Sequence, residues 1–404
     1  MSSLAKEERI EIADIFRRHG ERFRRTHRLP REHLRAMRAI ENCRTAALGG
    51  HIQQCDRCGH EVPAYNSCRN RHCPKCLAPA RRRWIRARES ELLPVPYFHV
   101  VFTIPAPIEP VVIRNRRAMY GILFRAVRET LLEISADEKH LGAVPGILAV
   151  LHTWGQTLSA HTHIHCVVPA GGMSRDGMRW VQGDSAFLLP VRVLSEVFRG
   201  KFMDFYRAAC NEGVIRFPGR IAHLADEKAR REMNRRLYAV NWVVYAKRPF
   251  GGPAQVLSYL AQYTHRVAIT NHRIEKLENG RVTFRYKDYR DHETKRLTLN
   301  AEEFIRRFLL HILPARFMKI RSFGFLANRD RRKKIERCRA LIRGARAEVK
   351  REEERCVAEK ADGISVPEYG EGPLERRCPV CHEGEMKRRR VLPPVRWNGA
   401  HAPP

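Results

Sequence analysis

The amino-acid sequence predicts an α+β fold that contains an antiparallel sheet. Three segments have the β-branched and aromatic composition of strands: residues 98–104, 146–154 and 161–168. Only a short turn separates the last two, so we expect them to pair antiparallel. Segments with the apolar spacing of helices alternate with the strands: residues 118–132, 198–210 and 226–238. Pairs of cysteines precede all of these segments, which predicts a metal-binding module in front of the α+β domain.

The composition indicates a globular protein with a polyanionic partner. The chain has 404 residues, enough for two to three domains, and a formal net charge of +32. This charge is spread along the chain without a long apolar segment, so we expect nucleic acid rather than a membrane as the partner. The first eight residues are polar and lack the apolar stretch of a signal peptide. We therefore expect a cytoplasmic location.

Residues 1–42 form the first predicted unit. They contain two basic segments with helical spacing, separated by Pro30. Two interpretations remain open for these helices. They could form an arm that contacts DNA phosphates, or they could be a solvated packing layer.

The next unit, residues 43–92, has the ligands of a zinc site. Cytoplasmic cysteines are more often metal ligands than disulfide partners, and six of the twelve lie between residues 43 and 76. Two Cys-x2-Cys pairs at suitable separation predict one tetrahedral site: Cys55, Cys58, Cys73 and Cys76. Four further candidates could hold a second zinc ion or serve a structural role: Cys43, His51, Cys68 and His72. Another pair, Cys378 and Cys381, is half of such a site without a neighbouring second half.

Clusters of arginine suggest contacts with DNA. Several arginines lie close to the predicted zinc module, one follows the tyrosine segment described below, and two belong to the most cationic stretch of the chain. Cationic side chains of this kind bind phosphates, although a charged stretch can also be a solvated surface. The candidates are Arg69, Arg71, Arg81, Arg82, Arg83, Arg266, Arg331 and Arg332.

The segment His161-Thr-His-Ile-His165 predicts a divalent metal site. Side chains alternate along a strand, so its three histidines share one face. His163 and His165 are roughly 7 Å apart on that face, close enough to bind one ion, whereas His161 is too far from His165 to join them. The alternative is that these imidazoles are hydrogen-bonded structural residues.

Two tyrosines in the same predicted domain, residues 93–275, form a second candidate site. Tyr259 and Tyr263 are four residues apart in a segment with helical spacing, so both phenols lie on one helical face. Packing is the alternative role for such a pair. Beyond this domain we expect a basic region, residues 276–345, with a hairpin over residues 282–299 and helices after it. A loosely ordered tail, residues 346–404, completes the chain.

Several motifs together resemble the two-tyrosine rolling-circle transposases of the insertion-sequence ninety-one type, members of the His-hydrophobe-His endonuclease superfamily. One of them is Tyr-Leu-Ala-Gln-Tyr-Thr-His-Arg at residues 259–266. The others occur in family order at residues 43–50, 66–76, 98–105, 161–165 and 323–328.

This resemblance implies a fold, an activity and partners. The fold is an antiparallel sheet with flanking helices, preceded by a structural Zn²⁺ module. The activity is cleavage and rejoining of single-stranded DNA at transposon ends by a nucleoid-associated enzyme. Tyr259 and Tyr263 would form 5′-phosphotyrosine links, while His163, His165 and Gln262 would bind catalytic Mg²⁺ or Mn²⁺.

Two other functions are compatible with these residues. A plasmid-type replication initiator or relaxase would use the same metal site and tyrosine chemistry. A zinc-dependent DNA-binding regulator without catalytic activity would use the zinc module alone, and His163 and Tyr259 would then be structural.

Overall fold

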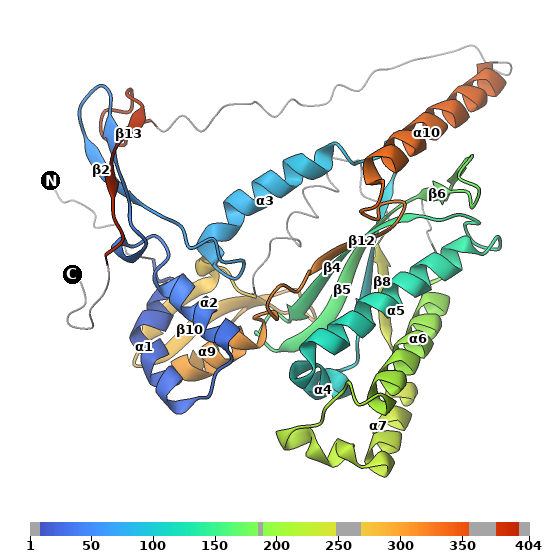
Figure 1. Cartoon of the computed structure of the whole chain (residues 1–404), viewed down its shortest axis with the longest axis horizontal. Coiled ribbons are helices and arrows are strands. Elements are labelled where there is room, and N and C mark those ends of the chain that lie inside the picture. Colours follow the sequence, from blue (N-terminus) through green and yellow to red (C-terminus); the bar gives the residue numbers. More distant parts are fainter. Residues whose placement is uncertain (1–8, 185–188, 248–267, 355–376, 396–404) are drawn as a thin grey trace.

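The computed structural model describes residues 9–184, 189–247, 268–354 and 377–395. Its helices and strands form a large sheet covered by helices, a helical assembly that includes the first helices of the chain, and a small cysteine-rich sheet (Figure 1). The predicted α+β class is confirmed, with antiparallel sheets and flanking helices preceded by the cysteine-rich module.

Five antiparallel strands form the large sheet in the order β12-β4-β5-β3-β8. The strands predicted at residues 98–104, 146–154 and 161–168 are confirmed, and β4 pairs with β5 as expected. The bounds are β3 (Tyr97–Thr103), β4 (Gly146–Trp154), β5 (Ala160–Pro169), β8 (Val243–Lys247) and β12 (Ile320–Gly324). Strand β12 lies in a stretch for which we expected helices, and it pairs with β4 far back in the sequence.

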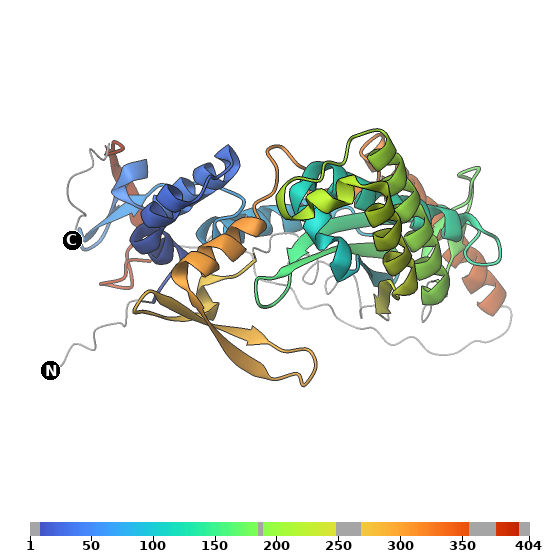
Figure 2. The same cartoon turned by 90° about the horizontal axis from the view of Figure 1, so that it is seen from below.

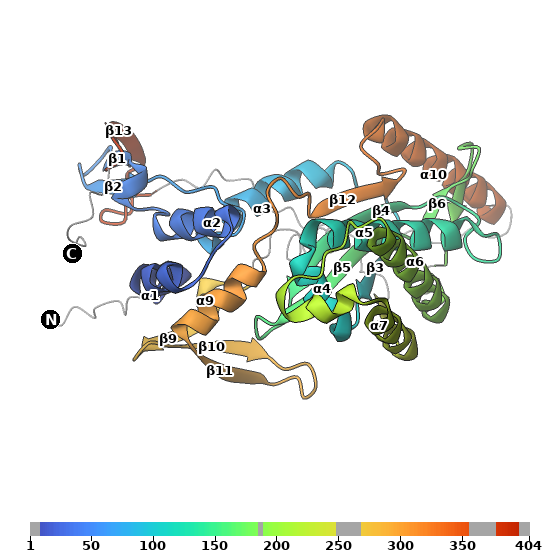
Figure 3. The same ribbon diagram turned by 60° about the horizontal axis from the view of Figure 1, so that its bottom comes forward.

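Helices cover one face of this sheet (Figure 3). Alternate side chains of the strands, such as Phe102 and Ile164, pack into one buried core with side chains of these helices. The helices are α4 (Glu109–Arg114), α5 (Arg116–Ala136), α6 (Val191–Asn211) and α7 (Glu227–Ala239). Because side chains alternate, His163 and His165 of β5 lie on the opposite face from Ile164 and Cys166.

The first helices pack against a distant part of the chain. Helices α1 (Ile12–Thr26) and α2 (Arg31–Glu41) share a buried core with α9 (Ala301–Leu310) and a three-stranded sheet. That sheet contains β9 (Ile274–Glu278), β10 (Arg281–Lys287) and β11 (Thr294–Asn300), including the predicted hairpin (Figure 2). The rings of Phe16 and Phe308 meet edge to face, with centroids 5.3 Å apart. The N-terminal helices therefore bury an apolar face, as the packing interpretation requires.

The cysteine-rich sheet joins segments from both ends of the chain. Its order is β13-β1-β2, with β1 (Gly50–Cys55), β2 (Glu61–Tyr65) and β13 (Met386–Leu392). Part of the predicted loosely ordered tail is therefore a strand paired with β1. Figure 1 shows β13 in the same small sheet as β2, on the opposite side of the molecule from the end of α10.

The remaining elements surround the large sheet. Helix α3 (Pro74–Glu89) leads from the cysteine-rich region toward that sheet, and α10 (Arg331–Glu354) packs near the hairpin of β6 (Gly171–Met173) and β7 (Trp180–Gln182). Short 3-10 helices are η1 (Ala46–Leu48), η2 (Ala106–Ile108), η3 (Gly219–Ala225) and η4 (Asn271–Arg273). Within the described ranges, none of the helices combines the length and apolar character that a membrane span requires.

Candidate metal and DNA-cleavage site

Three histidines on the large sheet can hold one metal ion. His152 of β4 joins His163 and His165 of β5, and each side chain offers a nitrogen within 4.8 Å of the others. The register of β4 and β5 places His152 directly opposite His163, which brings all three to the face away from the covering helices. Imidazole nitrogens at this separation suit a divalent cation.

A backbone hydrogen bond fixes the proton of His163. Its Nδ1 lies 2.8 Å from the carbonyl oxygen of His161. Because a carbonyl can only accept, Nδ1 carries the proton and Nε2 keeps the lone pair that binds a metal.

His165 is supported by a second histidine. His99 of β3 stacks against it with ring centroids 5.1 Å apart, and His99 Nε2 lies 2.8 Å from His165 Nδ1. Burial, with a smaller contribution from the charge of Lys247, lowers the pKa of His99 to about 4. His99 is therefore neutral near pH 7 and can accept a hydrogen bond. When His165 Nδ1 donates to it, the lone pair of His165 lies on Nε2, the nitrogen that would bind a metal.

A buried carboxylate supports the strand that carries the histidines. Glu109 of α4 accepts hydrogen bonds from both the backbone N–H and the hydroxyl of Thr162, the latter at 2.9 Å. Burial raises the pKa of Glu109, against the lowering effect of these hydrogen bonds. Thr162 lies between His161 and His163, so this interaction fixes the backbone of β5 at the site.

The structure brings together His163 and His165 as predicted and adds His152, which the sequence analysis missed. The antiparallel pairing of residues 146–154 with 161–168 contained the signal, because the correct register places a second histidine opposite His163. His161 is exposed and does not belong to the three-histidine group. Four predicted site residues lie outside the described residues: Tyr259, Gln262, Tyr263 and Arg266.

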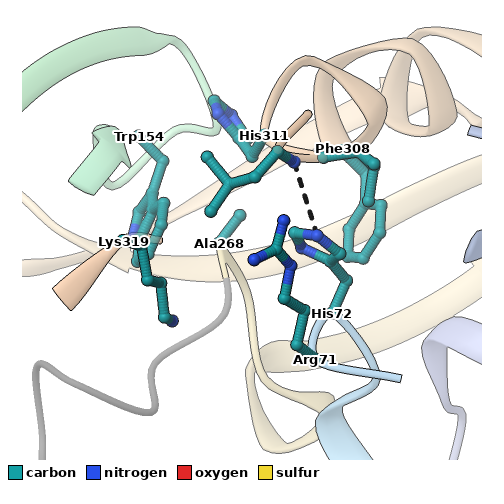
Figure 4. Close-up of a pocket in the computed structure, with 9 residues that line it drawn as sticks. Arg71, His72, Trp154, Ala268, Phe308, His311 and Lys319 are labelled. Atoms are coloured by element: carbon teal, nitrogen blue, oxygen red, sulfur yellow. Dashed lines mark hydrogen bonds between the residues drawn. The ribbon is translucent and has the colours of Figure 1, made fainter. Parts of the chain in front are cut away.

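Described residues on both sides of residues 248–267 lie near the histidines. Lys247 is paired with His99 across β8 and β3. Ala268 lines a pocket with Trp154 (Figure 4). The ring of Trp154 stacks on that of His152, with centroids 4.5 Å apart. Lys247 and Ala268 are each linked to the three-histidine group through one neighbour, His99 or Trp154.

The cysteines form two groups rather than the single predicted one. Cys55 and Cys58 do not meet Cys73 and Cys76, so that part of the prediction is wrong. The two groups are Cys43, Cys68, Cys73 and Cys76, and Cys55, Cys58, Cys378 and Cys381. The physical reason is that β1 carries its pair away from the start of α3, where Cys73 and Cys76 lie.

The first cysteine group has dimensions that suit zinc. The sulfur of Cys76 lies 3.5 Å from that of Cys43 and 3.6 Å from that of Cys68. Four thiolates around zinc, with Zn–S bonds of about 2.3 Å, lie about 3.8 Å from one another. Two candidate ligands lie outside both groups. His72 Nε2 accepts a hydrogen bond from the backbone of Leu313, and His51 lies on β1.

Seven of the eight predicted DNA-binding arginines lie in the described residues, and two of them bond within the fold. Arg71 donates to the carbonyl oxygens of Pro314 and Phe317, at 2.9 and 2.6 Å, and Arg331 pairs with Glu91. These two side chains therefore hold parts of the fold together. Arg81 is half-buried, and the exposed arginines are Arg69, Arg82, Arg83 and Arg332.

Two protein families match parts of this chain. Residues 15–104 match the family described as "Transposase zinc-binding domain", and residues 146–334 match the family described as "Putative transposase". The second match includes the three-histidine group, and the first includes the cysteines of the N-terminal module. Both the family match and the two cysteine groups support Zn²⁺ as a structural cofactor.

Two relatives extend the similarity over most of the chain. The protein named "Putative transposase y4qJ" from Sinorhizobium fredii (strain NBRC 101917 / NGR234) is 48% identical over 393 residues, which is 93% of this chain and 94% of the relative. The transposase for insertion sequence element IS801 from Pseudomonas savastanoi pv. phaseolicola is 29% identical over 71% of this chain and 68% of its own length. The chain therefore belongs to the transposases of the insertion-sequence ninety-one family.

Proposed function

We propose that this transposase is a metal-dependent tyrosine endonuclease and strand transferase that acts on single-stranded DNA in rolling-circle transposition. The observation that carries the proposal is the three-histidine group, which lies on the sheet face away from the covering helices. Such a group is costly to bury without a function, because neighbouring imidazoles repel one another when protonated.

His152, His163 and His165 would hold Mg²⁺ or Mn²⁺. The bound ion supplies Lewis-acid polarisation of the scissile phosphate. The hydrogen bonds from His163 to the His161 carbonyl and between His165 and His99 keep the ligand nitrogens oriented. With His152 present, three protein ligands are available without Gln262, which remains a further candidate.

Tyr259 and Tyr263 would be the nucleophiles. A bond forms between a phenol oxygen and phosphorus while the bond from phosphorus to the 3′ oxygen breaks, which leaves a 5′-phosphotyrosine and a free 3′-OH. The phenol proton passes to solvent and the leaving oxygen takes one up. The covalent link conserves the energy of the phosphodiester, so rejoining needs no nucleotide cofactor. Two tyrosines would allow two strands to be held at once.

The partner would be single-stranded DNA at the transposon ends. The net charge of +32 and the exposed Arg69, Arg82 and Arg83 near the zinc module favour contacts with phosphates. A replication initiator or relaxase would use the same chemistry, but the two relatives are named as transposases.

A nicking assay with metal and histidine variants tests this proposal. We expect the protein to nick single-stranded oligonucleotides from the element ends only when Mn²⁺ or Mg²⁺ is present. His152→Ala and His163→Ala should each lower the rate about a hundredfold or more, because a divalent ion contributes several kcal/mol of charge stabilisation. DNA binding should persist, since the ion does not read bases. The exposed His140, in the loop after α5, provides the matched control His140→Ala. Nicking at the wild-type rate by either site variant would contradict the role of that histidine as a metal ligand. Absence of nicking by the wild type with either ion would favour the regulator without catalytic activity.

A further inference from the structure

We propose that Cys55, Cys58, Cys378 and Cys381 form a second zinc site, which clasps the C-terminal segment onto the N-terminal module. Cys378 and Cys381 lie outside both regions that match the transposase families. The site therefore adds a metal ion and a link between distant parts of the chain to the zinc-binding domain.

The two cysteine pairs face one another with the spacing of a tetrahedral site. The sulfur of Cys55 lies 3.7 Å from that of Cys381, and the sulfur of Cys58 lies 3.5 Å from that of Cys378. These distances are close to the value of about 3.8 Å expected around zinc. All four cysteines are free of disulfide bonds. The geometry is thus that of four ligands around one centre.

Backbone N–H groups point at the sulfurs from both halves of the site. Cys55 accepts from the N–H groups two and three residues later, each at 3.4 Å. Cys378 accepts from Val380, and Cys381 accepts from Gly384, also at 3.4 Å. Such hydrogen bonds stabilise thiolates, which zinc requires as ligands. Four thiolates around a dication leave a net negative charge, and these donors disperse it.

The two halves are also built to approach closely. A Cβ atom on Gly384 would lie 2.3 Å from the sulfur of Cys55, so this position has no room for a side chain. Asp56 accepts a hydrogen bond from the N–H of Glu385 at 2.8 Å and donates its own N–H to the Glu385 carbonyl at 3.1 Å. The turn that carries Cys378 and Cys381 therefore packs directly against the turn that carries Cys55 and Cys58.

Apolar burial is too small to hold β13 in place. Only Met386 and Leu392, at its two ends, are half-buried, and the five residues between them are exposed. A small sheet of this kind needs a metal or disulfide to stay folded. The exposed residues include four consecutive cations, residues 387–390. The zinc clasp therefore fixes a basic strand beside the N-terminal module.

Zinc content gives the first test. By elemental analysis we expect the full-length protein to hold about two zinc ions per chain, and Cys378→Ser/Cys381→Ser to hold about one, because each ion needs four ligands. Cys210→Ser changes a half-buried cysteine outside both groups and should retain the wild-type content. Wild-type zinc content in the double variant would overturn the proposal.

Cysteine alkylation followed by mass spectrometry tests the link between the two ends. In the zinc-loaded wild type, Cys378 and Cys381 should be protected. In Cys55→Ser/Cys58→Ser they should become reactive, while the separate group around Cys43 stays protected and shows that the module remains folded. Equal reactivity of Cys378 and Cys381 in both proteins would rule out the shared site. If the Cys43 group also became reactive, the variant would be unfolded, and the zinc content of the C-terminal variant decides the question.

Discussion

At the scale of single residues, the proposed catalytic site depends on the orientation of each imidazole. The His161 carbonyl determines which nitrogen of His163 carries a proton, and His99 does the same for His165 when it accepts a hydrogen bond. His99 is buried and its pKa is lowered to about 4, so it stays neutral in this role. Its contribution can be measured separately from that of the ligands.

We predict that His99→Phe weakens Mn²⁺ binding by about 10- to 100-fold, the effect typical of losing a hydrogen-bond partner of a metal ligand. Phenylalanine fills the buried space but cannot accept from His165. Titration of the protein with Mn²⁺, followed by electron paramagnetic resonance, measures the affinity without requiring activity. Wild-type affinity in this variant would show that His99 does not orient His165.

At the scale of elements, the pairing of β4 with β5 was predictable, whereas the pairing of strands far apart in the sequence was not. Residues 146–154 and 161–168 have the composition of strands and are joined by a short turn. Strand β12 pairs with β4 across more than a hundred and sixty residues, and β13 pairs with β1 across more than three hundred residues. The composition of a segment does not show which distant strand it pairs with. For this reason the expectation of helix for the residues of β12 was wrong.

The same limitation explains the cysteine groups. Spacing predicts which cysteines form pairs, but it does not determine which pairs share a metal ion. Cys55 and Cys58 were assigned to the nearest pair in sequence, whereas the β1–β2 hairpin carries them to Cys378 and Cys381. His152 was missed for a related reason, because its significance depends on the register of β4 against β5.

Glu109 gives a prediction for the strand that carries the histidines. Glu109→Ala removes both acceptors from Thr162 and leaves a buried N–H unpaired, which should cost about 1–3 kcal/mol of stability. Nicking should also slow, since β5 loses its anchor beside His163. Thermal unfolding measures the first effect, with the exposed Glu133→Ala on α5 as the control. An equal melting temperature in both variants would contradict the role of Glu109.

At the scale of the whole molecule, segments that are far apart in the sequence pack together in common hydrophobic cores. The N-terminal helices pack on α9 and the β9–β11 sheet, and Phe308 of α9 lines the pocket of Figure 4 together with Trp154 of β4. His311 is buried there, with Nε2 3.1 Å from the Leu158 carbonyl and Nδ1 3.2 Å from the Thr153 hydroxyl. Burial, the main cause, lowers the pKa of His311 to about 4.

The lowered pKa of His311 predicts that the folded protein loses stability in acid. The unfolded chain binds a proton at His311 near pH 6.5, whereas the folded protein does so only near pH 4, so stability is lost as the pH falls between these values. Each pH unit in this window costs up to about 1.4 kcal/mol. Melting temperatures at pH 7 and pH 5 should differ more for the wild type than for His311→Gln, which cannot titrate. Equal pH dependence of the two proteins would show that His311 does not contribute.

The most direct test of the proposed mechanism is to identify the residue that becomes linked to DNA. The protein is mixed with Mn²⁺ and a single-stranded oligonucleotide from an element end, and the SDS-stable adduct is digested and mapped by mass spectrometry. We predict a 5′-phosphate on Tyr259 or Tyr263, and no adduct in Tyr259→Phe/Tyr263→Phe. DNA attached to another tyrosine, such as the exposed Tyr245 of β8, would contradict the assignment of the nucleophiles. The complete absence of an adduct, in conditions under which the DNA is nicked, would contradict covalent tyrosine catalysis itself.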